Sequence, residues 1–139
     1  MRRRGALAEG IDAALESRWL WLLARLLLSV VFLSSGLAKL IDFSGGLAEM
    51  RAAGLQPDWL FNLATAAVLL LGAVLLLLGR WIWIAAGMLS VFLLLTIAVV
   101  HRFWSLPEPQ ALQALFFALE HATVIGGLLA AAIAGHGRR

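Results

Sequence analysis

Long apolar runs dominate the chain and alternate with short polar segments. Four of these runs have the length of a membrane-spanning helix, at residues 19–40, 60–79, 81–100 and 111–134. A helix of about 20 mostly apolar residues crosses roughly 30 Å of hydrocarbon. The pattern predicts an all-α integral membrane protein, an antiparallel bundle of four transmembrane helices that forms one domain over residues 1–139.

The segments between these runs predict how the helices are joined. Residues 47–53, "LAEMRAA", are compatible with a helix and are followed by the stop signals Gly54 and Pro57, which predicts a short interfacial helix after the first span. A turn at residues 79–80 joins the second and third spans as a hairpin. The proline-containing segment 101–110 leads into the fourth span.

Composition and charge identify the surroundings of the bundle. Hydrophobic residues make up 63% of the 139 and charged residues 14%, which is more apolar surface than a soluble core of this size could bury. The net charge of +3 is interpreted as orienting the helices in a lipid bilayer, so no nucleic-acid partner is expected. Outside the spans or at their ends, seven basic residues lie on one side of the membrane and three on the other, which predicts that both termini are cytoplasmic. The seven are Arg2, Arg3, Arg4, Arg18, Arg80, Arg138 and Arg139, and the three are Lys39, Arg51 and Arg102.

The residue types exclude several classes of site. The absence of cysteine removes disulfides, zinc thiolates and dithiol redox chemistry, so a redox role would need a partner or a diffusible carrier. Three scattered histidines give no metal spacing, and no phosphate loop or nucleophile arrangement is present. We therefore predict no catalytic and no metal-binding residues, and no intrinsic enzyme activity.

Five segments in a fixed order carry a family resemblance: "RLLLSVVFLSSGLAKLIDF", "MRAAGLQP", "LLLGAVLLLLGR", "HRFW" and "FFALEHATVIGGLL". Together they resemble the DoxX family of small four-span bacterial membrane proteins, over roughly residues 22 to 130. The resemblance implies a four-helix bundle in the bacterial cytoplasmic membrane. It also implies an association with membrane redox complexes, because some relatives serve thiosulfate and quinone chemistry.

The chain departs from that family at two places. Family members commonly carry a glutamate three residues before the glycine of the second span, where this chain has Leu69. In the fourth span they carry a basic residue and an asparagine, where this chain has Glu120 and His121. Leu69 and Glu120 both lie nine residues inside the outer end of their spans, so Glu120 is a candidate replacement for the missing carboxylate.

Polar residues inside the spans form the candidate ligand-binding site. Arg25, Ser29 and Lys39 share one face of the first span, and Gln113 and Glu120 share a stripe on the fourth. Ionisable residues at this depth cost about 2.5 to 3.5 kcal/mol each, so the two faces are predicted to meet in the interior. Side chains in a helix point toward its N-terminus. This direction predicts that Lys39 and Glu120 form an ion pair and that Arg25 reaches toward the cytoplasmic interface. A pocket for a proton, an anion or a quinone headgroup is the alternative, and a lipid-facing carboxyl is a third.

Two histidines and a tryptophan are secondary candidates. His121 is interpreted as a neutral histidine bonded to a neighbouring helix. Haem ligation would need a second histidine, but His101 is expected about 13 Å away in depth. His101 and Trp104 instead indicate a polar and aromatic cluster at the outer surface, as the mouth of a pocket or as an interface anchor.

Two functions fit these observations. The first is an accessory membrane subunit of a redox complex. Its ligand would be a quinone or another lipid-soluble molecule, and its partner would be a redox subunit or a second copy of the chain. The second is a small transporter that moves protons or a small solute past Lys39, Glu120 and Arg25. The first is favoured because 139 residues leave little room for the paired repeats and broken helices of transporters.

Overall fold

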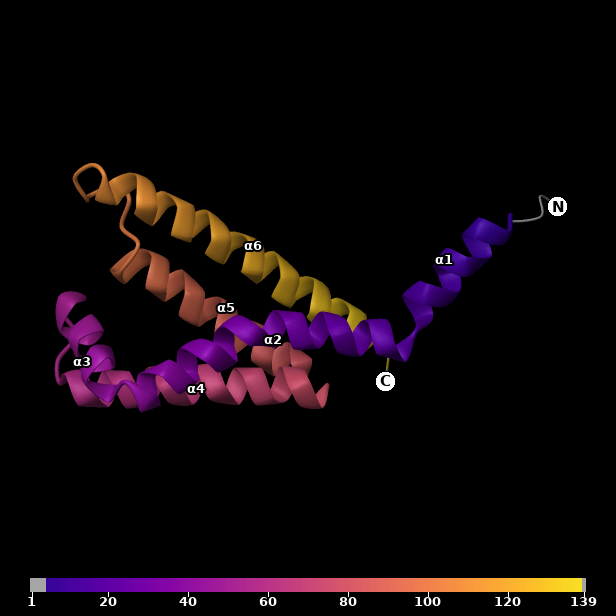
Figure 1. Ribbon diagram of the computed structural model, residues 1–139, viewed down its shortest axis with the longest axis horizontal. Helices are drawn as coiled ribbons and strands as arrows, with labels where there is room; N and C mark the ends of the chain where they lie inside the picture. The colour runs from indigo at the N-terminus through magenta and orange to yellow at the C-terminus, as the bar shows by residue number, and fades with distance from the viewer. Residues whose placement is uncertain (1–4, 139) are drawn as a thin grey trace.

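The computed structural model describes residues 5–138, and within that range every regular element is an α-helix (Figure 1). The prediction of an all-helical membrane protein with four spans is confirmed, because α2, α4, α5 and α6 are long and apolar enough to cross a membrane. Each of their ends lies within two residues of the predicted boundary. Arg2, Arg3, Arg4 and Arg139, which the topology prediction uses, lie outside the described residues. The helices are α1 (Ala6–Glu16), α2 (Arg18–Ile41), α3 (Phe43–Ala52), α4 (Asp58–Leu78), α5 (Ile82–Val99) and α6 (Gln110–His136).

Helix α2 packs mainly against α4. A Cβ at Gly36 of α2 would lie only 2.8 Å from the side chain of Leu70 on α4, so glycine allows this close approach. The start of α4 lies beside the end of α2, where α3 follows, and we call this region the α3 end. The turn from α4 to α5 lies at the opposite side of the fold, and we call that region the Gly79 end (Figure 1). Gly79 has a φ of 68°, a left-handed conformation that suits glycine and ends α4 at the predicted turn.

Helix α6 packs mainly against α5 and makes fewer contacts with α2. A Cβ at Gly127 or at Gly135 would lie 3.5 Å from Leu28 and from Trp21 of α2, respectively. In Figure 1, α2 and α6 approach each other near the C-terminus and separate toward α3. The prediction that the polar faces of the first and fourth spans meet is therefore wrong, because the face of α2 that carries Gly36 is covered by α4.

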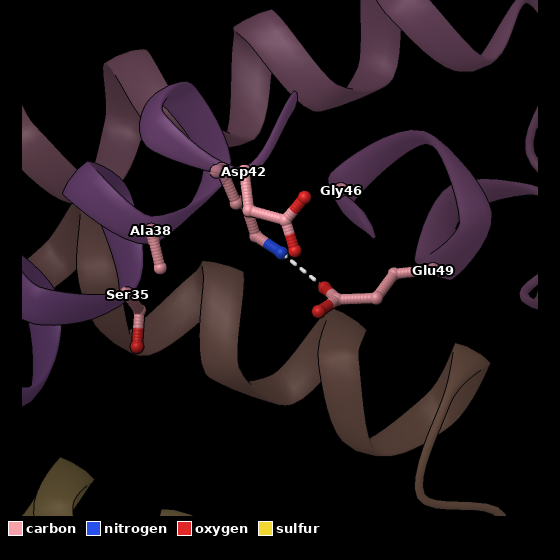
Figure 2. Close-up of a pocket in the computed structure, with 6 residues that line it drawn as sticks. Ser35, Ala38, Asp42, Gly46 and Glu49 are labelled. Carbon is pink, nitrogen blue, oxygen red and sulfur yellow. Dashed lines mark hydrogen bonds and ion pairs between the residues drawn. The ribbon is translucent and has the colours of Figure 1, made fainter. Parts of the chain in front are cut away.

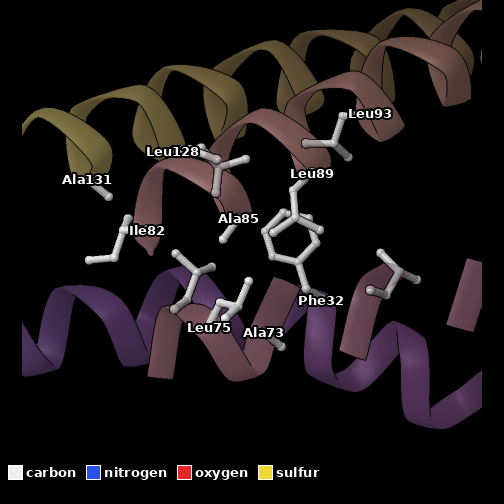
Figure 3. Packing of buried hydrophobic residues seen from close by; sticks show 12 residues of the cluster. Phe32, Ala73, Leu75, Ile82, Ala85, Leu89, Leu93, Leu128 and Ala131 are labelled. Atoms are coloured by element: carbon white, nitrogen blue, oxygen red, sulfur yellow. The ribbon is translucent and has the colours of Figure 1, made fainter. Parts of the chain in front are cut away.

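The core contains side chains from all four long helices (Figure 3). Phe32, Leu76, Leu89 and Leu128 are its largest fully buried apolar residues, one from each helix. Leu69 belongs to the same cluster, so the position where relatives commonly carry a glutamate is an apolar packing position in this chain. Among the described residues, Ser29 and Asn62 are the only polar side chains classed as buried.

Two shorter helices complete the chain. Helix α3 follows the first span, where the sequence predicts a helix, and it packs against α4 and α2. Helix α1 was not predicted, because it is too short and too polar to register as a span. Its Leu7, Ile11 and Leu15 recur every four residues, and all three side chains are exposed. This spacing gives α1 one apolar face that no other described element covers.

Candidate functional site

Lys39 lines a polar cavity at the α3 end, and Figure 2 shows this cavity with Asp42 and Glu49 beside it. Its Nζ forms an ion pair with the carboxylate of Glu49, which α3 folds back onto the end of α2. The Lys39 side chain is 14% exposed and that of Glu49 is 65% exposed, so the pair connects an enclosed cation to a solvated anion. The cavity, of about 230 Å³, adjoins the pair and is also lined by Ser35, Asp42 and Gly46. The predicted Lys39–Glu120 pair is wrong, because a nearer carboxylate on α3 binds the ammonium.

Asn62 supports this site from beneath, and the sequence analysis did not single it out. Its side chain is fully buried, and its Nδ2 donates a hydrogen bond to the backbone oxygen of Lys39 at 3.1 Å. A Cβ at Gly46 would overlap the Asn62 amide, so the glycine lets α3 pack directly on it. A single asparagine near the start of an otherwise apolar span was the available signal, since buried amides need a partner.

Arg25 and Ser29 lie away from that site. Nη1 of Arg25 donates to the carbonyl oxygens of Leu76 and Leu77 at the end of α4, at 3.2 and 2.9 Å. The side chain therefore extends toward the Gly79 end, where it ends on protein carbonyls. Ser29 is buried and its hydroxyl donates to Leu26 of its own helix at 2.9 Å. The structure does not bring Arg25, Ser29 and Lys39 into one site.

Gln113 and Glu120 are exposed on α6. The interactions of the described residues include no ion pair or hydrogen bond for the Glu120 carboxyl. The sequence left three alternatives for Glu120: an ion pair with Lys39, a ligand pocket, and a lipid-facing carboxyl. The structure agrees with the third, because the side chain is exposed. Glu120 also does not take the place of a carboxylate at Leu69, because Leu69 is buried among core residues and Glu120 is exposed.

His101 and His121 are in direct contact. Their ring centroids lie 4.9 Å apart in an edge-to-face arrangement, and His101 also stacks on Phe117 at 5.0 Å. The expected separation in depth is wrong, because α6 has 27 residues and α5 has 18. The nine additional residues extend α6 by roughly 13 Å beyond the end of α5, which brings His121 level with His101. Trp104 is exposed, and its ring packs edge-to-face on Phe103 with the centroids 5.1 Å apart.

The environment of His101 favours its neutral form. Burial lowers the pKa of His101, and the neighbouring His121 lowers it further, because a second positive charge nearby would be repelled. A neutral imidazole has one nitrogen that donates and one that accepts a hydrogen bond. The histidine pair can therefore offer both a donor and an acceptor to a polar ligand beside the Phe117 ring.

Comparison with protein families adds to this geometry. The DoxX family model matches residues 20–102, more than half of the chain. The chain belongs to the DoxX family. DoxX proteins are small membrane proteins, in agreement with the four spans. The match covers the segment from α2 to α5, and the DoxX model does not extend over α6 with Glu120 and His121. Comparisons with curated proteins and with solved structures gave no match.

Proposed function

We propose that this DoxX protein is a non-catalytic, accessory subunit of a larger membrane complex. In this proposal it is inserted in the bacterial cytoplasmic membrane as an antiparallel four-helix bundle, with both termini cytoplasmic and α3 at the outer interface. One observation carries the proposal. Glu120 is an exposed carboxyl within the apolar helix α6, and no ion pair or hydrogen bond of the described residues involves it.

Glu120 lies among exposed apolar side chains of α6, such as Phe116 and Leu119. It lies ten residues after Gln110 and sixteen before His136, which is about 15 Å and about 24 Å along the helix. Its neighbour His121 is level with His101, just beyond the end of α5, so Glu120 lies toward the outer end of the bundle. Ionisable residues within membrane helices normally face protein or water, so an exposed carboxyl among apolar side chains supports a second protein surface on this side of α6.

The residues around Glu120 suit a closely packed helix. Thr123 and Gly126 are exposed and share a face of α6 with Leu119, beside Glu120. A Cβ at Gly126 would meet no atom within 4 Å, so packing within the chain does not require this glycine. Small residues on a membrane helix allow another backbone to approach closely. The partner is then a transmembrane helix with a cation or a hydrogen-bond donor at the depth of Glu120.

The family resemblance and the histidine pair suggest the kind of complex. Some DoxX relatives are associated with membrane redox complexes, and we propose such a complex as the setting of this chain. His101, His121 and Phe117 combine hydrogen-bonding groups with a flat aromatic ring. This combination suits the headgroup of a quinone, which has carbonyl oxygens on an apolar ring. The transporter alternative is less well supported, because within residues 5–138 the buried side chains are apolar apart from Ser29 and Asn62.

Affinity purification of the tagged chain from gently solubilised membranes, followed by mass spectrometry, tests the proposal. The wild type is compared with Glu120→Ala and with Glu108→Ala, which removes an exposed glutamate from the loop before α6. We expect a stoichiometric partner subunit with the wild type and with Glu108→Ala, and at least about tenfold less of it with Glu120→Ala, since truncating a central charged contact costs about 2 kcal/mol or more. Equal recovery from all three, or recovery of the chain alone, would contradict the proposal.

A further inference from the structure

A second cavity, of about 540 Å³, lies at the Gly79 end. It is bordered by residues from the start of α2, from the turn between α4 and α5, and from the end of α6. Its volume lies within the range of about 300 to 1,000 Å³ that is typical of ligand sites. The residues that matter here are Trp21, Arg80, Trp81, Ile82, Gly135 and Arg138.

The charged groups at this cavity are cationic. Arg80 and Arg138 both border it, and no carboxylate is present among its described lining residues. The Arg80 guanidinium lies 5.1 Å from the centroid of the Trp81 ring, and that of Arg138 lies 5.3 Å from the Trp21 ring. Contact between a guanidinium and an aromatic face holds the side chain in place while its N–H donors remain available.

Backbone groups add to this positive potential. Helix α5 begins at Ile82, and the first N–H groups of a helix have no acceptor within it, so they attract anions. The carbonyl end of α4 would add a negative potential here. Arg25 counters it by donating hydrogen bonds to the carbonyl oxygens of Leu76 and Leu77. Arg138 similarly donates to the carbonyl oxygen of Leu15 near the end of α1, at 2.9 Å. The negative ends of two helices are thus neutralised beside the cavity.

The rest of the lining is apolar. Ile82 packs against the end of α6, since a Cβ at Gly135 would lie 2.9 Å from its side chain. Tryptophan rings are typical of the level at which lipid headgroups meet the hydrocarbon. Basic pockets between spans at that level bind anionic lipid headgroups. The cavity therefore combines two guanidinium groups with an apolar wall beside the bilayer.

We propose that this cavity binds a phosphate group, and that the group belongs to an anionic phospholipid. Arg80 and Arg138 would donate to the phosphate oxygens, and the apolar wall would contact the start of the acyl chains. This site lies at the opposite side of the fold from Lys39 and its pair with Glu49. It does not depend on the partner subunit proposed above.

The test measures binding to the purified full chain in an uncharged detergent, with tryptophan fluorescence and native mass spectrometry as readouts. The probes are dioctanoyl-phosphatidylglycerol, dioctanoyl-phosphatidylcholine and inorganic phosphate. Arg80→Gln is compared with Arg102→Gln, which removes the same charge from an exposed position after α5. We expect the phosphatidylglycerol to bind at least about tenfold more tightly than the phosphatidylcholine, and Arg80→Gln to weaken it about tenfold, because a charge-assisted hydrogen bond is lost.

Arg102→Gln is expected to leave the affinity for phosphatidylglycerol within about twofold of the wild type, because Arg102 does not border the cavity. Equal binding of the two lipids would overturn the phosphate site. Equal losses in the two arginine variants would also overturn it, since general surface charge would then explain the binding. Inorganic phosphate that binds as tightly as phosphatidylglycerol would overturn the lipid as the source of the phosphate.

Discussion

Arg25 of α2 donates a hydrogen bond to the carbonyl oxygen of Leu77 on α4, with Nη1 and the oxygen 2.9 Å apart. The last carbonyls of a helix have no partner within it, and the negative end of the helix dipole lies there. A cation from α2 thus satisfies the end of α4. The same contact helps to explain why α2 pairs with α4 rather than with α6.

Replacing Arg25 with methionine should destabilise the fold. The substitution removes the donor from the carbonyls of Leu76 and Leu77, and unsatisfied buried groups cost about 1 to 3 kcal/mol. Thermal unfolding in detergent measures the loss. Arg18→Met is the control, because Arg18 is exposed and contacts the Trp19 ring, so we expect a change within about 0.5 kcal/mol. Similar losses in the two variants would contradict the role of Arg25.

Two glycines in the spans should respond differently to alanine. A Cβ at Gly72 would lie 2.6 Å from the fully buried Leu89, so Gly72→Ala should cost about 1 to 3 kcal/mol through overpacking. A Cβ at Gly87 would meet no atom within 4 Å, so Gly87→Ala should be neutral or slightly stabilising. Melting temperatures of the two variants test this, and the reverse order would show that α4 and α5 do not pack as described.

A double-mutant cycle separates the two carboxylates proposed as partners of Lys39. Lys39→Met and Glu49→Gln should show a coupling of about 0.2 to 1 kcal/mol, because one member of the ion pair is largely exposed. The matched cycle with Glu120→Gln should be additive within about 0.5 kcal/mol. Both are measured by thermal unfolding. Coupling of Lys39 to Glu120 but not to Glu49 would restore the pairing that the sequence predicted.

The pKa of His101 predicts how stability depends on pH. Because its pKa is lower in the folded chain than the ordinary value of 6.5, the unfolded chain binds more protons between the two values, and stability rises with pH there. The melting temperature should therefore fall as the pH is lowered below about 6.5. In His101→Gln the fall should be shallower. An unchanged pH dependence in that variant would show that His101 does not cause it.

The sequence predicted the spans well because span length depends on the bilayer and hardly on neighbouring helices. An apolar run must cover the hydrocarbon whatever it packs against, so residues 19–40 already locate α2. The turn at Gly79 followed from a local signal in the same way. Leu7, Ile11 and Leu15 carried a local signal for α1, but their run is shorter than a span.

Contacts between helices could not be predicted in this way. The periodicity placed Arg25 and Lys39 on one face of α2 but did not determine which helix covers that face. Packing decides it, through Gly36 against Leu70 and through Asn62 against the backbone of Lys39. The depth of His121 was missed because it depends on how far α6 extends beyond α5, which the apolar windows alone do not define.

The most direct test of the partner surface on α6 is site-specific photo-crosslinking in native membranes. A photoreactive amino acid replaces Leu119, which is 54% exposed beside Glu120, or Leu94 of α5, which is 57% exposed and serves as the matched control. The account predicts that Leu119 crosslinks to a distinct membrane protein and that this product is lost in Glu120→Ala, whereas Leu94 gives only lipid adducts. Lipid adducts alone from both positions would contradict the claim that Glu120 faces a partner subunit.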